Sequence, residues 1–147
     1  MFCRREFEQN GLNPDVAQSS VARNVRRGTL RGMHYQVAPY EETKLIRCIT
    51  GSIFDVVVDL RPNSPTFRRW QGLELEASTG GMIYVPRGFA HGYQTLAEAT
   101  EIMYLTSQFY QPSHERGVRW NDPALAIRWP IAEPILSEKD RAHPYLD

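Results

Sequence analysis

Two short segments of the chain each carry a histidine at the end of a run of strand-forming residues. His34 lies in Leu-Arg-Gly-Met-His-Tyr-Gln, and His91 lies in Pro-Arg-Gly-Phe-Ala-His-Gly. Lys44 lies between the two histidines, and Tyr104 follows them. Histidine titrates near neutral pH and can act as a general base, while a cation or a phenol can stabilise or protonate the resulting anion. The set is suited to moving a proton on a carbon next to a carbonyl group.

Each of these residues also has an ordinary structural interpretation. A strand histidine can be a core residue held by a hydrogen bond, a lysine is usually solvated, and a tyrosine often packs in a core. A catalytic His34 needs an acidic partner to fix its tautomer, and Asp55 and Asp140 are both candidates. Arg31 and His34 are three positions apart and would face opposite ways on a regular strand. Both reach one pocket only if the strand bends or ends there.

His91 lies in a Pro-x-Gly-x-x-His pattern that matches the second half of the metal site in many cupin barrels. The first half needs His-x-His with a later glutamate, but the corresponding segment reads His34-Tyr35-Gln36. Two separated histidines are too few ligands for a closed metal site. The sequence therefore predicts no metal and a histidine that contacts substrate, with a metal-dependent cupin as the alternative.

Composition narrows the function classes. The chain has 147 residues with 17 basic and 17 acidic side chains, which predicts one domain over residues 1–147 and no global attraction to nucleic acid. No apolar run reaches the roughly 20 residues of a membrane span. The two cysteines, Cys3 and Cys48, form no disulfide framework or metal spacing, which favours a reduced, cytoplasmic setting.

Short β-rich runs separated by turn residues must position these side chains. The pattern predicts a short helix over residues 3–10 that stops at Gly11, an irregular polar region over 13–28, and a last helical turn beginning at Ser137. Strands are expected over 29–36, 43–50, 53–60, 68–77, 82–85, 88–96 and 101–109. Strands at this spacing indicate a sandwich or barrel. The run 53–60 is apolar enough to lie centrally.

Together these segments resemble the dTDP-4-dehydrorhamnose 3,5-epimerase family of nucleotide-sugar epimerases. The shared stretches occur in family order from about residue 2 to the C-terminus. They are Gly28–Gln36, Lys44–Arg47, Phe54–Arg61, Ser64–Thr66, Pro86–Gly92, Tyr104 with Tyr110, Trp120–Pro123, Trp129–Pro130 and Ser137–Asp140.

The resemblance implies an all-β, cupin-type jelly roll with short peripheral helices, a homodimer, and catalysis without metal or cofactor. It implies epimerisation of a dTDP-linked 4-keto-6-deoxy sugar at C3 and C5, with a C3-only epimerase as a variant. In the family, the residue matching His34 removes a proton beside the C4 ketone. Asp140, or less securely Asp55, matches the aspartate that orients this histidine. Lys44 matches the enolate-stabilising lysine, and Tyr104 the tyrosine that returns a proton from the opposite face.

The resemblance also implies residues that contact the substrate or its diphosphate. They match Arg31, His91, Glu115, Lys139, Tyr110 and Asp55.

The chain departs from the family pattern near its start. Family members usually carry a further N-terminal Asp-x-Arg-Gly-x-Phe segment, so we expect a nucleotide contact and one or two strands to be missing. A missing strand leaves an open sheet edge unless a partner covers it. Residues 19–24 replace the usual Gln-x-Asn-like stretch, and Glu42 stands where many members have glutamine. These differences keep a non-catalytic, nucleotide-sugar-binding relative as an alternative.

Overall fold

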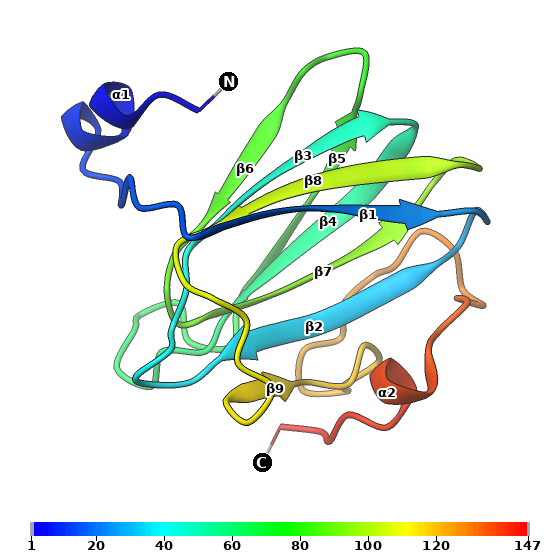
Figure 1. The fold of residues 1–147 in the computed structure, drawn as a ribbon. Coiled ribbons are helices and arrows are strands. Elements are labelled where there is room, and N and C mark those ends of the chain that lie inside the picture. The colour runs from blue at the N-terminus through cyan, green and yellow to red at the C-terminus, as the bar shows by residue number, and fades with distance from the viewer. Residues whose placement is uncertain (1, 147) are drawn as a thin grey trace.

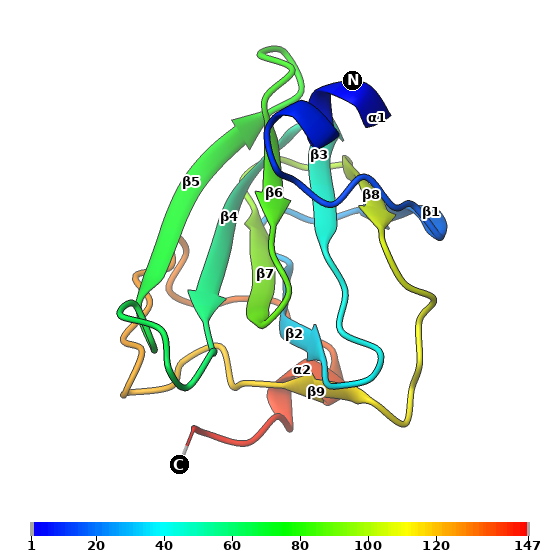
Figure 2. The ribbon, with the colours of Figure 1, turned by 90° about the vertical axis from the view of Figure 1, so that its left-hand side faces the viewer.

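The computed structural model describes residues 2–146, and its strands form two antiparallel sheets that face each other (Figure 1). The strand order is β1-β8-β3-β6 in the first sheet and β5-β4-β7-β2-β9 in the second. The sheets curve around a shared interior, as the view in Figure 2 shows. The strands are β1 (Gln18–Asn24), β2 (Leu30–Gln36), β3 (Lys44–Thr50), β4 (Ser52–Asp59), β5 (Trp70–Glu76), β6 (Met82–Val85), β7 (Phe89–Thr95), β8 (Thr100–Thr106) and β9 (Glu115–Gly117).

Both predicted helices are present. Helix α1 (Arg4–Gln9) is followed by Gly11 at a positive φ of 68°, the conformation that favours glycine after a helix. Helix α2 (Glu138–Arg141) is capped by Ser137, whose hydroxyl oxygen accepts the Asp140 N–H at 3.0 Å. Within residues 2–146, neither helix has the length and apolar character needed to cross a bilayer.

The expectation of an irregular region over residues 13–28 is wrong, because Gln18–Asn24 forms strand β1. This strand lies at a sheet edge and pairs with β8 over its whole length, from Gln18 opposite Thr106 to Asn24 opposite Thr100. Most of its side chains are exposed or half-buried. Because few of its side chains are buried, the segment lacks the apolar alternation by which a strand is recognised in a sequence. It forms a strand because it pairs with β8.

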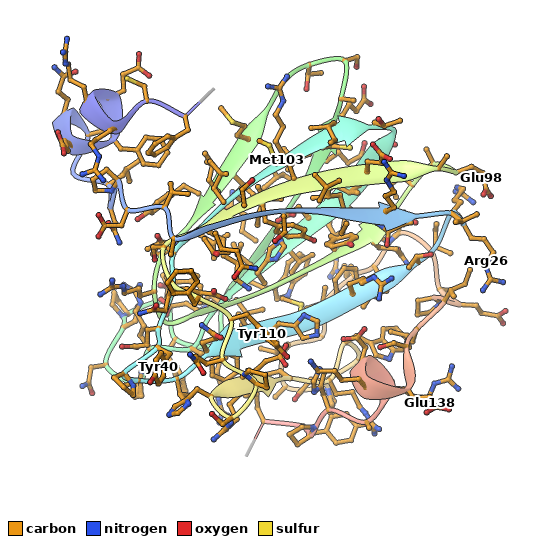
Figure 3. All side chains as sticks on the ribbon, in the orientation of Figure 1. Arg26, Tyr40, Glu98, Met103, Tyr110 and Glu138 are labelled. Carbon is orange, nitrogen blue, oxygen red and sulfur yellow. The ribbon has the colours of Figure 1, made fainter. Side chains whose placement is uncertain are left out.

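Side chains from the inner faces of the two sheets fill the space between them (Figure 3). Ile46 and Ile102 from the first sheet pack with Ile53 and Tyr93 from the second, and each is at most 2% exposed. Strand β4 lies between β5 and β7, which confirms the central position expected for the apolar run. This core is the rigid support on which the polar side chains of the inner faces are held.

Candidate active site

Strand β2 brings Arg31 and His34 to the same face despite their spacing of three. Arg31 pairs with Tyr93 of β7 and His34 pairs with His91, so an extra residue of β2 lies between the two pairs. This irregularity is a β-bulge, which shifts the alternation of side chains by one. The bend that the sequence required is therefore present, and Arg31 and His34 lie on the same face of β2, opposite Tyr93 and His91 of β7.

Gly32 makes the bulge possible. Its φ is +122°, in the region that favours glycine, and a Cβ there would lie 2.7 Å from Gly92 Cα and 2.8 Å from the His91 carbonyl oxygen. A side chain cannot be accommodated because both neighbours are backbone atoms of β7. The glycine before Met33 in the Leu-Arg-Gly-Met-His motif thus sets the direction of the histidine that follows.

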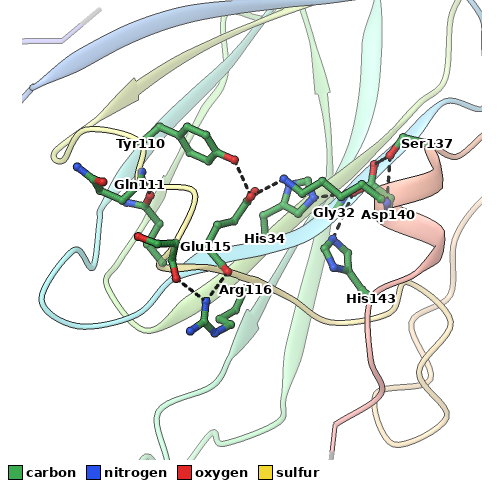
Figure 4. A network of polar contacts seen from close by, with 12 residues as sticks. Gly32, His34, Tyr110, Gln111, Glu115, Arg116, Ser137, Asp140 and His143 are labelled. Carbon is green, nitrogen blue, oxygen red and sulfur yellow. Dashed lines mark hydrogen bonds and ion pairs between the residues drawn. The ribbon is translucent and has the colours of Figure 1, made fainter.

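His34 is paired with Asp140, which decides between the two aspartates considered from the sequence. The His34 Nε2 lies 2.6 Å from Asp140 Oδ1, and the other carboxylate oxygen accepts the Ser137 hydroxyl at 2.7 Å (Figure 4). Burial alone raises the pKa of Asp140, but the hydrogen bonds from His34 and Ser137 outweigh it and lower the pKa to about 2. Asp140 is therefore a carboxylate at neutral pH and can stabilise a protonated His34.

Asp55 forms a second dyad with the other histidine. Its Oδ2 lies 2.8 Å from the His91 Nε2, and the two side chains are 0% and 4% exposed. Its second oxygen has no hydrogen-bond partner among the residues that the structure describes. The His91 ring lies edge-on to that of Tyr104, with centroids 6.3 Å apart, so this dyad on β4 and β7 contacts the opposite sheet through Tyr104 of β8.

Tyr104 and Lys44 face the same interior from the first sheet. Tyr104 on β8 pairs with Ile46 on β3, and Lys44 lies two positions before Ile46, so the three share one face. Burial raises the pKa of Tyr104 well above the ordinary range for a phenol. The Lys44 ammonium lies 3.2 Å from the Glu42 carboxylate, and both side chains are about nine-tenths buried at 12% and 11% exposure. A phenol that keeps its proton and a buried cation are thus available in one interior.

Tyr110 and Glu115 lie beside His34 (Figure 4), and Lys139 joins them through a hydrogen bond to Glu115. The Tyr110 hydroxyl donates to Glu115 at 2.7 Å, and the Lys139 ammonium binds the same carboxylate oxygen. Burial works to raise the pKa of Glu115, but these two donors outweigh it and lower the pKa. Strand β8 ends at Thr106, so Tyr110 does not continue the strand face of Tyr104 and is instead 50% exposed.

His143 is a residue near the site that the sequence interpretation missed. Its ring centroid lies 5.3 Å from that of His34, and its Nε2 lies 3.6 Å from Asp140 Oδ1. Burial lowers the pKa of His143, which favours the neutral imidazole. A Cβ on Gly117 would overlap the ring, so the glycine of β9 leaves the space that His143 fills. Its spacing of three from Asp140 at a helix end was the signal available in the sequence.

His34, Asp140 and His143 are also the residues best placed to hold a metal, since their ligand atoms lie within 4.8 Å of one another. The 2.6 Å between His34 Nε2 and Asp140 Oδ1 is a hydrogen-bond distance. Two ligands of one tetrahedral zinc would be separated by about 3.3 Å, given bonds of about 2.0–2.1 Å. The geometry therefore fits a proton-transfer dyad better than a metal centre.

Comparison with known proteins agrees with this geometry. The family model described as dTDP-4-dehydrorhamnose 3,5-epimerase matches residues 1–147. The chain belongs to the dTDP-4-dehydrorhamnose 3,5-epimerase family. It is therefore an isomerase, an epimerase that acts on carbohydrates, with the family's cupin-like jelly roll.

Individual members of the 3,5-epimerase family align over nearly the whole chain. The Shigella flexneri dTDP-4-dehydrorhamnose 3,5-epimerase is 41% identical over an alignment of 146 positions, and the alignment covers 92% of this chain and 81% of that protein. The crystal structure of the Bacillus anthracis enzyme with TDP and PPi bound has a TM-score of 0.96 at 44% identity, covering 99% of this chain and 83% of that one. ChmJ, a 3'-monoepimerase from Streptomyces bikiniensis in complex with dTDP-quinovose, has a TM-score of 0.91 at 38% identity, covering 98% and 73%.

Proposed function

We propose that this chain epimerises a dTDP-linked 4-keto-6-deoxyhexose at C3 and C5, with His34 as the general base and Tyr104 as the acid. The observation that carries the proposal is the 2.6 Å contact between His34 and the ionised Asp140. A carboxylate at this position holds the imidazole in one tautomer and stabilises the imidazolium that forms when His34 takes a proton. Family membership supports the substrate class.

The reaction divides between the two sheets. His34 on β2 removes the proton from the carbon next to the ketone, which leaves an enolate. Tyr104 on β8, in the facing sheet, then gives its proton to the opposite side of the same carbon, and the centre inverts. The high pKa of Tyr104 keeps its proton available until the enolate forms. A base and an acid on opposite faces explain inversion, whereas one group alone would return the proton to the face it left.

Lys44 is proposed to stabilise the enolate oxygen. A C–H beside a ketone is acidic enough for removal only if positive charge or hydrogen bonds hold the developing oxyanion. Lys44 is a buried cation on the strand next to that of Tyr104, and Glu42 fixes its position. His91, which lies opposite His34 on β7, and Asp55, which hydrogen-bonds His91, are proposed to contact the sugar.

The nucleoside diphosphate is proposed to bind beside Arg31. A cavity of about 380 Å³ there is lined by three arginines, Arg23, Arg26 and Arg31, and by Ser137, which also binds Asp140. Guanidinium groups pair well with phosphate oxygens. Binding of this remote part of the substrate would hold the sugar ring in place for the proton transfers. Glu115, Lys139 and Tyr110, which hydrogen-bond one another, are proposed as further contacts to the substrate.

We further propose a homodimer in a reducing, cytoplasmic compartment. Cys3 and Cys48 are both free thiols in the structure, as expected where disulfides do not form. Light scattering on the purified protein at several concentrations tests the assembly, and a mass of one chain at all of them would contradict it.

Incubation with dTDP-4-keto-6-deoxyglucose in D2O tests the reaction. We expect deuterium at both C3 and C5, read by NMR and mass spectrometry, together with an inverted product. Label at C3 alone would assign the C3-only reaction, which ChmJ represents among the similar structures. No label from folded protein would refute the catalytic proposal and favour a non-catalytic, nucleotide-sugar-binding relative.

A further inference from the structure

A line of hydrogen bonds leads from Arg31 to the proposed acid Tyr104. The Arg31 Nε donates to the Asn24 side-chain oxygen at 3.3 Å, and the Asn24 amide nitrogen donates to the Tyr93 hydroxyl at 3.2 Å. The Tyr93 hydroxyl in turn hydrogen-bonds that of Tyr104, and the two ring centroids are 6.5 Å apart. The line joins the cavity lined by arginines to the phenol in the interior of the jelly roll.

The hydrogen bonds in this line can all be donated in one direction, from Arg31 towards Tyr104. Because the guanidinium has no acceptor, it must donate to Asn24, which fixes the amide with its oxygen toward Arg31. The amide nitrogen then donates to the Tyr93 oxygen at 3.2 Å. The Tyr93 proton has two acceptors, the Asn24 oxygen at 3.4 Å, which Arg31 already engages, and the Tyr104 oxygen. It turns to Tyr104 when that oxygen becomes negative, because a hydrogen bond to a charged acceptor is the stronger one. Hydrogen bonds arranged head to tail polarise one another, and a cation at the start strengthens donation at the end.

Burial strengthens the hydrogen bonds that connect Arg31 with Tyr104. Asn24 and Tyr93 are 3% and 2% exposed, so water does not compete for their hydrogen bonds. When Tyr104 gives its proton to carbon, the O–H bond breaks, a C–H bond forms, and the negative charge of the enolate moves to the phenolate oxygen. Burial disfavours that charge, so the phenolate needs a donor within the protein.

We propose that Tyr93 is a positioning residue that donates a hydrogen bond to Tyr104 and stabilises its phenolate, with Asn24 and Arg31 holding Tyr93 in the donating orientation. The inference rests on the proposed function and adds a specific source of stabilisation for its acid. Two phenols that share a hydrogen bond carry one negative charge more easily than either does alone, and two charges with difficulty. Removal of the Tyr93 hydroxyl therefore affects the step in which Tyr104 ionises and spares the step in which His34 acts.

The test compares Tyr93→Phe with wild type in D2O, measuring both deuterium exchange and inverted product. We expect exchange within about threefold of wild type and epimerised product about 10- to 100-fold slower, the effect of one lost hydrogen bond to a charged group. The alkaline limb of the rate profile should also move to higher pH, since the phenolate loses its donor. The other charged or titratable groups that face the phenol pair are Asp55 on β4, His91 on β7 and Arg31 on β2, and they are unchanged in this variant.

Asn24→Asp is a second variant that keeps the Tyr93 hydroxyl. A carboxylate at this position accepts the Tyr93 proton and turns it away from Tyr104, so the same split between exchange and epimerisation is expected. Tyr84→Phe is the matched control, because the Tyr84 hydroxyl accepts the Asn13 N–H at 3.1 Å and lies beneath α1, outside the site. It should behave as wild type in both readings.

Two results would overturn the inference. One is an unchanged ratio of epimerisation to exchange in both Tyr93→Phe and Asn24→Asp. The other is an equal loss of exchange and epimerisation in both variants while their circular dichroism stays native. Failure of the proposed function is distinguishable, because wild type itself would then show neither exchange nor epimerised product.

Discussion

Replacing Asp140 with asparagine is the perturbation whose size follows most directly from the structure. Asparagine keeps the shape of the side chain and removes the charge beside His34. The folded protein lowers the pKa of Asp140 from 3.8 to about 2, which corresponds to about 2.4 kcal/mol in favour of the carboxylate. The substitution therefore removes the negative charge 2.6 Å from the His34 Nε2, which would stabilise the imidazolium that forms when His34 takes a proton.

The expected loss of activity follows from the loss of this partner. The carboxylate holds the His34 tautomer and stabilises the imidazolium formed during the reaction, and general-base catalysis of this kind supplies about 10² to 10⁴ in rate. We therefore expect Asp140→Asn to slow deuterium exchange at C3 and C5 by about 10²-fold or more. Exchange is the correct assay because it reports proton removal by His34 without requiring Tyr104.

The same substitution has a stability signature with a definite sign. Since folding lowers the pKa of Asp140, its contribution to stability is present above about pH 4 and is lost as the pH falls towards 2. Asp140→Asn should be less stable than wild type at pH 7, by up to about 2.4 kcal/mol, and the difference should shrink between pH 4 and 2. Urea unfolding at several pH values measures it.

A second buried aspartate provides the control. Asp122 is 1% exposed and its carboxylate accepts the N–H groups of Ala124 and Leu146 at 2.7 and 2.6 Å, with no histidine beside it. Asp122→Asn should lose stability but keep wild-type exchange per folded molecule. Exchange by folded Asp140→Asn within threefold of wild type would refute the dyad.

Three further predictions concern the cation, a loop and the bulge. Lys44→Met should lower kcat by about 10² to 10³ with little change in substrate affinity, as measured by steady-state kinetics and dTDP titration. Adding Glu42→Gln to this variant should restore its stability but not its turnover. A loss of substrate affinity alone would count against a role for Lys44 in stabilising the enolate. Asp59→Asn should lower the free energy of unfolding in urea by about 2–3 kcal/mol, because the carboxylate accepts several hydrogen bonds. Since folding lowers the pKa of Asp59, the difference in stability between wild type and variant should shrink as the pH falls below about 4. Gly32→Ala should lower the melting temperature far more than Gly11→Ala, whose positive φ costs about 1 kcal/mol in open space; equal losses would show that the close approach to β7 is unimportant.

The sequence predicted most of the fold because most strands carry their own signal. The run 53–60 is apolar apart from Asp55 and Asp59 and lies centrally, and turn residues bound the other strands from residue 29 to 106. Strand β1 has no such signal, since it is a mostly polar edge strand defined by pairing with β8. Strand β9 was also not predicted, because three residues are too few for a recognisable period.

The sequence singled out residue types that the structure brings together, but it could not predict how they pair. Whether Asp55 or Asp140 meets His34 depends on where the C-terminal tail returns, 106 residues further along the chain, and no local pattern encodes that. The contact between Asn24 and Tyr93 could not be predicted for a similar reason. Their side chains meet across 69 residues of sequence, and each alone looks like an ordinary strand residue.

The division of the reaction between His34 and Tyr104 is the central claim, and Tyr104→Phe tests it most directly. The measurement is the ratio of inverted product to deuterium exchange at C3 and C5 in D2O, with His34→Ala as the reference that loses both. The account predicts that Tyr104→Phe retains exchange while epimerisation falls by about 10² or more. An equal fall of exchange and epimerisation in folded Tyr104→Phe would contradict the assignment of base and acid to opposite faces of the sugar.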